Sequence, residues 1–256
     1  YKINLKSKKI VKKLSIETYD LGFLLSDSFS SAQLLYRADI NRRIGYRGQF
    51  RIWMLTDSLS LKNSQYFHRT DKYLQLLTLV GITPRTEEYP QISAPVVSRF
   101  PKNWENEKIN IGINTNSVAK SRRWPSEFWI ELFGQLCTPK FQFIFFGGPD
   151  DWEPNQKIIE KSNGNLINFA GRSTLANSMA IMSRCQLMIS NDSGPMHLAD
   201  ALGVPTIGLF GAGDTSSTGL RSKNSSNLNV KSYCSPCKKN ICSNKIDPLI
   251  CLSQIT

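Results

Sequence analysis

Apolar and polar positions alternate in blocks through the second half of the chain. Five apolar runs have the length of strands: 109–113, 142–146, 166–169, 186–190 and 206–210. Four amphipathic stretches of helical length separate or follow them: 126–136, 153–162, 175–183 and 195–202. Repeated strand–helix–strand units predict a parallel sheet with helices on both faces. Ligands of such sheets bind outside the carboxyl ends of the strands.

The first hundred residues are less regular. Residues 21–25 are typical of a strand, and Asp27 or Ser28 is placed to cap a helix that runs through Tyr36. Residues 71–80 are expected to be helical up to the glycine that follows. The sequence therefore predicts a second, smaller α/β region before the regular one.

Four prolines within residues 84–106 predict a linker between two domains. We expect domain bounds of 1–100 and 101–256, which a chain of 256 residues can accommodate. Residues 211–232 are rich in Gly, Ser, Thr and Asn and predict a mobile loop or several turns. The chain begins with tyrosine rather than methionine, so we expect a fragment or a processed chain.

The composition bears on membrane insertion, secretion and the charge of a binding partner. Apolar residues make up 40% of the chain, and no apolar run reaches the roughly 18 residues of a membrane span. The basic start is not followed by the apolar segment of a secretory signal. A net charge of +12 fits either a solvated lysine-rich surface or an anionic partner. One basic cluster is interleaved with Tyr46, Phe50 and Trp53, and consists of Arg42, Arg43, Arg47 and Arg51.

Six cysteines are present. Cys137 and Cys185 lie in apolar surroundings and are predicted to be small core residues. The other four have the spacing C-x2-C-x4-C-x8-C near the end of the chain: Cys234, Cys237, Cys242 and Cys251. This spacing leaves open a zinc site, reduced thiols or disulfides. Disulfides are disfavoured by the lack of a secretion signal.

The segment "SNDSGPMHLADALGVPTIGLFG", residues 190–211, carries the strongest chemical signal. Its turn lies at the carboxyl end of a strand, where Asp192 or Ser193 can cap the following helix. Gly194 permits close approach of a ligand to the backbone. Free amides and the helix dipole favour an anion there, and His197 lies one turn further on. The residues fit a diphosphate cradle or, more simply, a capped helix with a packing histidine.

Two further loops follow strands of the predicted sheet. "NTNSVAKSRRWPSEFW" offers hydroxyls and cations for phosphate oxygens: Thr115, Ser117, Lys120, Arg122 and Arg123. "FFGGPDDWE" offers Asp150, Asp151 and Glu153, which suit either ribose hydroxyls or the start of a helix. The simpler interpretation of the first loop is a solvated basic surface.

Together these segments resemble glycosyltransferase family 9, which contains the ADP-heptose–lipopolysaccharide heptosyltransferases. The similarity is strongest in "SNDSGPMHLADALGVPTIGLFG" and extends to "RRWPSEFW", "FIFFGGPDD" and "NFAGRSTLANSMAIMSRCQLMIS". The ending "CSPCKKNIC" is similar to the cysteine-rich end of the type II enzymes. "YDLGFLLSDSFSSAQL", "RRIGYRGQFR" and "HRTDKYLQLL" resemble pieces of the acceptor domain. The resemblance covers nearly the whole chain from Tyr19.

This resemblance implies the α/β fold called GT-B, which has two Rossmann-like domains. The N-terminal domain is expected to be incomplete in this chain. The resemblance also implies inverting, metal-independent transfer of heptose from ADP-heptose to the lipopolysaccharide inner core, without a cofactor. Carried over by position, the donor would bind at Thr115, Ser117, Lys120, Arg122, Asp151, Asp192, Ser193, Gly194, Met196 and His197. The acceptor's phosphates and acidic sugars would meet Arg42, Arg43 and Arg47. The implied setting is cytoplasmic, with the lipid A–core acceptor and the anionic inner-membrane surface as partners and no nucleic acid.

The chain also departs from the family pattern. The family's catalytic base is an aspartate after the first N-terminal strand, which is expected upstream of residue 1. Arg122 replaces a lysine, and Ser30 replaces an arginine of the type II pattern. "FGAGDTSS" replaces a proline-threonine-aspartate-proline turn, and the family's closing helix would follow Ile255. Three alternatives stay open: another nucleotide sugar on the same fold, a non-catalytic nucleotide-sugar or anion-binding module, or a basic nucleic-acid binder with a zinc knuckle, for which the sequence contains no recognised motif.

Overall fold

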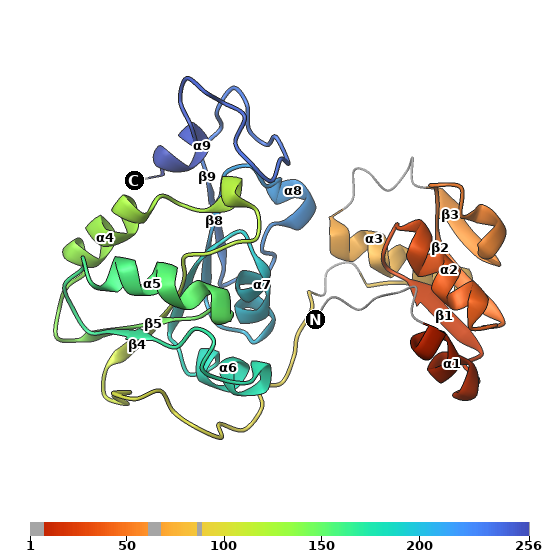
Figure 1. Ribbon diagram of the computed structural model, residues 1–256, viewed down its shortest axis with the longest axis horizontal. Coiled ribbons are helices and arrows are strands. Elements are labelled where there is room, and N and C mark those ends of the chain that lie inside the picture. The colour runs from red at the N-terminus through yellow and green to blue at the C-terminus, as the bar shows by residue number, and fades with distance from the viewer. Residues whose placement is uncertain (1–7, 61–67, 86–88, 256) are drawn as a thin grey trace. The chain divides into compact units, whose positions relative to one another are not determined.

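The computed structural model describes residues 8–60, 68–85 and 89–255, in two compact units, Tyr1–Glu88 and Tyr89–Thr256 (Figure 1). The division falls earlier than the expected domain boundary at 100/101. Residues 89–100 belong to the second unit, and several of them are hydrogen-bonded to its helices. The Ile92 amide donates to the Ala201 carbonyl at 2.9 Å, and the Ser98 and Arg99 amides donate to Asn177 Oδ1. Residues 86–88 of the predicted linker lie outside the described residues.

The second unit contains the predicted parallel sheet (Figure 1), in the strand order β6-β5-β4-β7-β8-β9. The strands are β4 (Ile109–Asn114), β5 (Phe141–Phe145), β6 (Leu166–Asn168), β7 (Leu187–Asn191), β8 (Thr206–Phe210) and β9 (Ser226–Asn229). The four predicted helices are α4 (Ser126–Gln135), α5 (Trp152–Ile159), α6 (Leu175–Met182) and α7 (Gly194–Ala201). The α/β fold is thus confirmed, with bounds that differ from the predicted ones by a few residues.

Alternation along the strands divides the core between the two faces of this sheet. Trp129 and Phe133 of α4, both fully buried, pack with Ile113 and Phe145 on one face. The cluster on the other face contains Ile144, Ile181, Met182, Met188 and Ala199, so α6 and α7 cover it. Burial of each large apolar side chain contributes about 1.5–3 kcal/mol. The sheet is therefore a rigid support for the loops at its carboxyl edge.

Two predictions for the second unit need correction. Residues 211–232 contain α8 (Thr215–Thr218) and the edge strand β9 rather than loop alone. The sequence of β9, "SNLN", is almost entirely polar and its side chains are mostly exposed, as is common in a strand at the edge of a sheet. Cys137 is exposed, since it follows the end of α4, whereas Cys185 is buried as predicted. The chain closes with a short helix, α9 (Ile250–Ser253).

The first unit is a three-stranded parallel sheet in the order β1-β2-β3. Its strands are β1 (Leu21–Leu24), β2 (Arg42–Arg47) and β3 (Asp57–Ser60). The helices are α1 (Lys8–Ile16), α2 (Phe29–Arg37) and α3 (Arg69–Gln75), and the 3-10 helices are η1 (Ile52–Met54) and η3 (Leu76–Val80). Ser28 caps α2 as predicted, by accepting from the Ser31 amide.

The sequence analysis missed β2 for an identifiable reason. Its sequence, "RRIGYR", begins and ends with arginine, and only the central residues 44–46 are buried. The expected helix at residues 71–80 is divided into α3 and η3, and it ends at Gly81, whose φ of 77° is left-handed.

Candidate functional site

Two neighbouring strands place the predicted loops at one edge of the sheet. β4 ends at Asn114 and β7 ends at Asn191, and the strands are adjacent and parallel. The buried Asn191 side chain joins the loops, because its Nδ2 donates to the Thr115 carbonyl at 2.6 Å and its Oδ1 accepts from the Trp124 amide at 3.0 Å. Neither asparagine was predicted as functional, since an asparagine at a strand end gives no chemical signal.

The first turn of α7 has an unusual start. Ser193 occupies the N-cap position, but its side chain makes no capping hydrogen bond. Its Oγ instead accepts from Nδ2 of the buried Asn114 at 2.6 Å. A serine in this position ordinarily satisfies an amide of the first turn. Ser193 therefore does not cap the helix through its side chain, and its hydroxyl leaves the first-turn amides available to an external acceptor.

A cavity of about 690 Å³ opens at this helix start. Added atoms at the Gly194 Cβ position would meet nothing within 4 Å, so the backbone is open to an incoming group. One wall comes from the β4 and β7 loops: Asn114, Asn116, Ser117, Val118, Arg123, Ser193, Gly194, Pro195 and Leu198. The opposite wall comes from the β5 loop and α6: Phe146, Gly147, Gly148, Pro149, Asp150, Asp151, Gly171, Ser173, Leu175, Ser178 and Met182.

Four of the predicted donor residues line this cavity: Ser117, Asp151, Ser193 and Gly194. Thr115 is turned away, because its Oγ1 donates to Asn155 Oδ1 on α5 at 2.7 Å. Thr115 and the exposed Lys120 line a separate hollow of about 420 Å³. His197 is exposed on α7 outside the cavity lining. The Met196 side chain is fully buried with Phe210 and Leu220, so only its backbone faces the helix start.

Asp192 and Arg122 form an ion pair instead of lining the cavity. Arg122 Nη1 lies 3.0 Å from Asp192 Oδ2, and only 2% of the Asp192 side chain is exposed. The carboxylate lies against Gly213, where an added Cβ would be 2.0 Å from Asp192 Oδ2. Removal of one partner from a buried pair is costly because the other charge loses its compensation. This geometry gives Asp192 a positioning role in the turn before α7.

Arg123 is the cation that the structure places in the cavity wall. Its Nε donates to the Ser117 carbonyl at 2.7 Å, which fixes the guanidinium beside the helix start. The sequence offered both Arg122 and Arg123 for phosphate oxygens, and the family resemblance then implied Arg122 by its position. Arginine forms short, charge-assisted bonds to phosphate oxygens.

The acids after β5 also differ in availability. Asp151 Oδ2 accepts from the Gly148 amide at 2.8 Å and caps its own turn. The exposed Glu153 pairs with Lys157 at 2.7 Å, and that hydrogen bond lowers the pKa of Glu153. Asp150 and Asp151 both line the cavity, and Asp150 is exposed. Asp150 therefore joins Asp151 as a candidate for sugar hydroxyls, while Glu153 is not among the residues that line the cavity.

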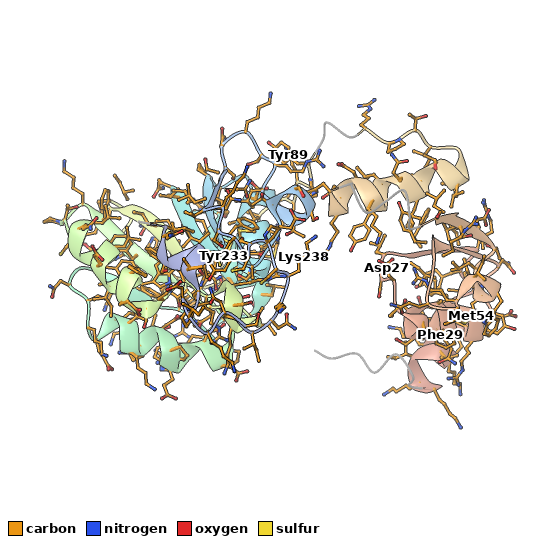
Figure 2. The ribbon with its side chains drawn as sticks, turned by 90° about the horizontal axis from the view of Figure 1, so that it is seen from above. Asp27, Phe29, Met54, Tyr89, Tyr233 and Lys238 are labelled. Carbon is orange, nitrogen blue, oxygen red and sulfur yellow. The ribbon has the colours of Figure 1, made fainter. Side chains whose placement is uncertain are left out.

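The cysteine-rich segment, residues 234–251, is hydrogen-bonded to the loops that flank the site. The Ser121 amide donates to the Asn240 carbonyl at 3.1 Å, and the Lys238 amide to the Ala212 carbonyl at 2.8 Å. Lys238 Nζ, whose residue is labelled in Figure 2, pairs with Asp214 at 2.8 Å. Hydrogen bonds from Lys238, Ser216 and Ser217 hold the pKa of Asp214 well below its usual range. The segment thus fixes both flanking loops.

All six cysteines are free thiols in the structure. Burial raises the pKa of Cys251 to about 11, and the charges of neighbouring cysteines add to this shift. Among residues 8–60, 68–85 and 89–255, no group of three or more His, Cys, Asp and Glu is arranged to hold a metal ion.

The predicted acceptor arginines are divided between the two ends of β2. At the amino end, Arg42 pairs with Asp57 at 3.0 Å, and Arg43 donates to the Ile40 and Met54 carbonyls. Arg47 lies at the carboxyl end, exposed. Arg47 Nη2 also donates to the Ser58 carbonyl, at 3.4 Å. Parallel sheets bind ligands at the carboxyl ends of their strands, so Arg47 is the one of the three with the placement expected of a binding residue.

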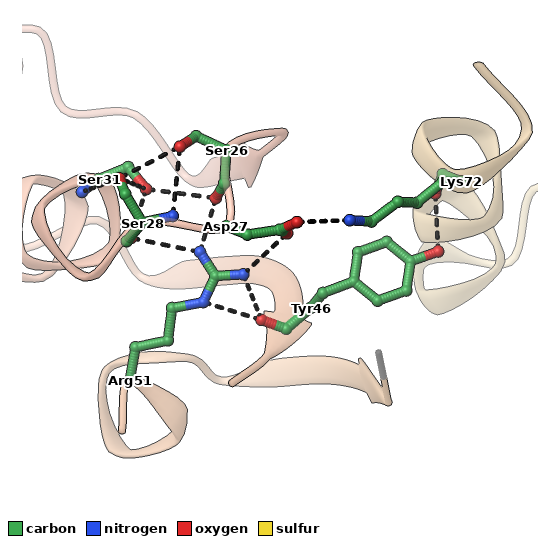
Figure 3. Close-up of polar contacts among 7 residues, drawn as sticks. All are labelled: Ser26, Asp27, Ser28, Ser31, Tyr46, Arg51 and Lys72. Atoms are coloured by element: carbon green, nitrogen blue, oxygen red, sulfur yellow. Dashed lines mark hydrogen bonds and ion pairs between the residues drawn. The ribbon is translucent and has the colours of Figure 1, made fainter. Parts of the chain in front are cut away.

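Asp27 and Lys72 were not predicted as site residues (Figure 3). Asp27 follows β1 and lies between two cations, Arg51 Nη2 at 3.2 Å and Lys72 Nζ at 2.5 Å. Tyr46 donates its hydroxyl to the Lys72 carbonyl at 2.7 Å, and burial raises the pKa of that hydroxyl. The Asp27 side chain is 37% exposed, so this cluster reaches solvent.

Comparison with known proteins gives a consistent result. Residues 7–246 match the profile of glycosyltransferase family 9 (heptosyltransferase). The chain is 29% identical over 219 residues to lipopolysaccharide heptosyltransferase 2 of Escherichia coli strain K12, covering 80% of this chain and 63% of that protein. It is 27% identical over 213 residues to lipooligosaccharide heptosyltransferase 2 of Haemophilus influenzae, covering 76% of this chain and 61% of that protein. The chain thus spans less than two thirds of the length of these curated relatives.

Solved structures agree with the fold. The structure of E. coli ADP-heptose lps heptosyltransferase II has a TM-score of 0.74 at 25% identity, over 88% of this chain and 72% of that one. E. coli heptosyltransferase WaaC with ADP has a TM-score of 0.68 at 18% identity, over 86% and 69% of the two chains. At that identity the second likeness concerns the fold alone. In residues 8–60, 68–85 and 89–255, no helix is long and apolar enough to cross a membrane.

Proposed function

The chain belongs to glycosyltransferase family 9, and on that premise we propose that it transfers a heptose from ADP-heptose to the lipopolysaccharide inner core. A relative of known structure is described as an ADP-heptose heptosyltransferase, and another as bound to ADP. The observation that carries the proposal is the uncapped start of α7, which opens into a cavity large enough for a small ligand.

The proposed donor pose follows from the chemistry of the cavity walls. The diphosphate lies at the amides of Gly194 and Met196. The helix dipole favours negative charge there, and the Ser193 side chain does not cap this first turn. Arg123 bonds the phosphate oxygens from the β4 loop. Asp150 accepts from sugar hydroxyls on the opposite wall. Ser117, which donates its Oγ to the Asp192 carbonyl at 3.2 Å, keeps the two loops at fixed separation.

The proposed chemistry is an inverting displacement. An acceptor hydroxyl oxygen attacks the anomeric carbon, the bond from that carbon to the ADP oxygen breaks, and the hydroxyl proton passes to a base. Negative charge develops on the departing ADP. The α7 amides and Arg123 stabilise that charge, because the helix start and the Arg123–Ser117 hydrogen bond hold them in the cavity wall before the reaction. These residues assign the donor half of the reaction to the second unit.

The acceptor half is proposed for the first unit. Arg47 and Lys72 supply positive charge at the carboxyl end of its sheet. The Asp27 carboxylate can accept a hydrogen bond from a sugar hydroxyl. These groups suit a saccharide that carries phosphates or acidic sugars. We propose that transfer occurs on the cytoplasmic side, where a nucleotide-sugar donor would be encountered.

Thermal unfolding with added nucleotide tests the donor proposal. A ligand that binds only the folded chain stabilises it by about 2.7 kcal/mol at a hundredfold excess over Kd. ADP is expected to raise the Tm more than UDP or adenosine, and Arg123→Gln to weaken ADP binding about tenfold, or 1.4 kcal/mol. Arg184→Gln, at an exposed arginine outside the cavity, is the matched control. Equal shifts by ADP and adenosine, or no effect of Arg123→Gln, would refute the diphosphate pose.

A further inference from the structure

A hollow of about 530 Å³ lies beside β6, the edge strand of the six-stranded sheet. It has no described lining residue in common with the cavity at the start of α7. Its volume is within the range of small-molecule pockets in proteins. Three cations line it, and no aspartate or glutamate is among its described lining residues. We call it the β6 hollow, and its cations are Arg99, Lys102 and Arg172.

One wall of the β6 hollow is an irregular segment, residues 99–103, that buried side-chain amides hold in place. Asn177 of α6 accepts from the Arg99 amide at 3.0 Å through Oδ1 and donates to the Arg99 carbonyl at 2.7 Å through Nδ2. Gln142 of β5, which is fully buried, donates to the Asn103 carbonyl at 2.9 Å. Both ends of the segment are therefore fixed, so the hollow is a built feature of the fold.

Another wall holds an arginine against an aromatic ring. The Arg172 guanidinium lies over the Trp152 ring, 3.5 Å from its centre, and Asn168 of β6 donates to the Trp152 carbonyl at 3.0 Å. A guanidinium on a ring face is attracted to the ring and keeps its N–H groups, which form paired bonds to phosphate or carboxylate oxygens. Arg172 is thus oriented before a ligand arrives.

The charges of the three cations are not compensated by the protein. Within the part of the chain that the structure describes, no acceptor and no acid is bonded to the side chain of Arg99, Lys102 or Arg172. Other cations of the unit are paired, as Lys108 is with Glu105 at 2.9 Å. A concave surface lined by charges of one sign concentrates ions of the opposite sign. The β6 hollow is therefore suited to an anion.

Apolar side chains supply the remaining surface of the hollow. Ile167 and Phe169 are buried, whereas Phe100 is 43% exposed. A ring placed against Phe100 removes apolar surface from water, which stabilises a complex by about 25 cal/mol for each Å² buried. An inorganic anion gains the charge interaction but not this contribution. The walls therefore favour an anion that carries an apolar ring.

We propose that the β6 hollow is a second ligand site of this unit and takes the phosphate monoester of a ring-bearing molecule. Arg99 and Arg172 bind the phosphate oxygens, Lys102 adds positive charge, and the ring lies against Phe100. A phosphate monoester is favoured over a carboxylate because it carries about 1.5–2 negative charges at pH 7. The proposal does not depend on heptose transfer, because no residue of the diphosphate pose lines this hollow.

Titration of the whole chain with phenyl phosphate, followed by NMR, tests this proposal. The indole N–H signal of Trp152 and the amide signals of Arg99 and Lys102 are expected to move. Inorganic phosphate, which lacks the ring, and benzoate, which carries a single charge, are expected to need at least about tenfold higher concentrations to reach the midpoint of the shift, a difference of 1.4 kcal/mol. A midpoint for either anion equal to that of phenyl phosphate would overturn the proposed class of ligand.

Arg99→Gln combined with Arg172→Gln is expected to raise the phenyl phosphate midpoint at least about tenfold, and Lys102→Gln alone about threefold. All three side chains are exposed, so the fold should be unchanged by circular dichroism. Arg184→Gln, at an exposed arginine outside the hollow, is the matched control and should leave the midpoint unchanged. Gly194→Glu, in the wall of the other cavity, should also leave it unchanged. An unaltered midpoint in the double variant, or loss of the shifts in Gly194→Glu, would overturn the proposal.

Discussion

Replacement of Gly194 by glutamate is expected to abolish ADP binding while the chain remains folded. A side chain at this position meets no atom within 4 Å at its Cβ, so the substitution fits the helix start. Its carboxylate then occupies the space beside the α7 amides and repels a diphosphate. We expect a loss of affinity of about a hundredfold or more, or 2.8 kcal/mol, measured by isothermal titration calorimetry.

The same substitution is expected to raise stability slightly. A carboxylate in the first turn of a helix contributes about 0.3–1 kcal/mol through the helix dipole. Affinity and stability should therefore change in opposite directions, which a merely damaged protein would not show. Gly134→Glu is the control, because Gly134 on α4 also has open space at its Cβ but lies outside the cavity. Wild-type ADP affinity in Gly194→Glu would contradict the placement of the diphosphate.

Replacement of Arg51 by methionine is expected to destabilise the first unit by about 3 kcal/mol. Methionine fills part of the volume but leaves the carbonyls of Ser26, Ser28 and Tyr46 without their donor. Burial lowers the pKa of the Arg51 guanidinium, which Asp27 partly opposes. The expected loss of stability is at the lower end of the range for a buried pair, because the Asp27 side chain is 37% exposed and solvent compensates its charge.

Hydrogen exchange followed by mass spectrometry resolves this effect by region. Peptides that contain β1 and β2 should exchange faster in Arg51→Met, and peptides that contain β4 and β7 should not change. Arg37→Met is the control, since Arg37 is exposed on α2. Unchanged protection of β2 in Arg51→Met would mean that the guanidinium does not hold this segment.

Much of the second unit could be predicted because its apolar periodicity is regular. Buried parallel strands such as β5 ("FQFIF") and β8 ("TIGLF") are nearly continuous apolar runs, and amphipathic helices separate the strands. β2 and β9 escaped because a short strand with polar ends lacks that signal. Tertiary pairing, rather than local sequence, determines these two strands.

The sequence was enough to locate the candidate site, but not to assign a role to each of its residues. The turn before α7 was identified from Asp192, Ser193 and Gly194, because their chemistry at a strand end favours an anion. Their roles then differ for reasons that depend on contacts far apart in the sequence. Asn114 withdraws the Ser193 hydroxyl from capping, and Asp192 takes Arg122 out of the cavity. Neither relation is visible from spacing.

The central claim is that the α7 amides receive the diphosphate of a sugar nucleotide. Amide chemical shifts measured by NMR during titration with ADP and with adenosine test it most directly, since Gly194 and Met196 each carry an amide proton and Pro195 does not. We predict that the Gly194 and Met196 signals move with ADP and stay in place with adenosine. Shifts confined to other regions, such as the hollow lined by Arg99, Lys102 and Arg172, would contradict the account.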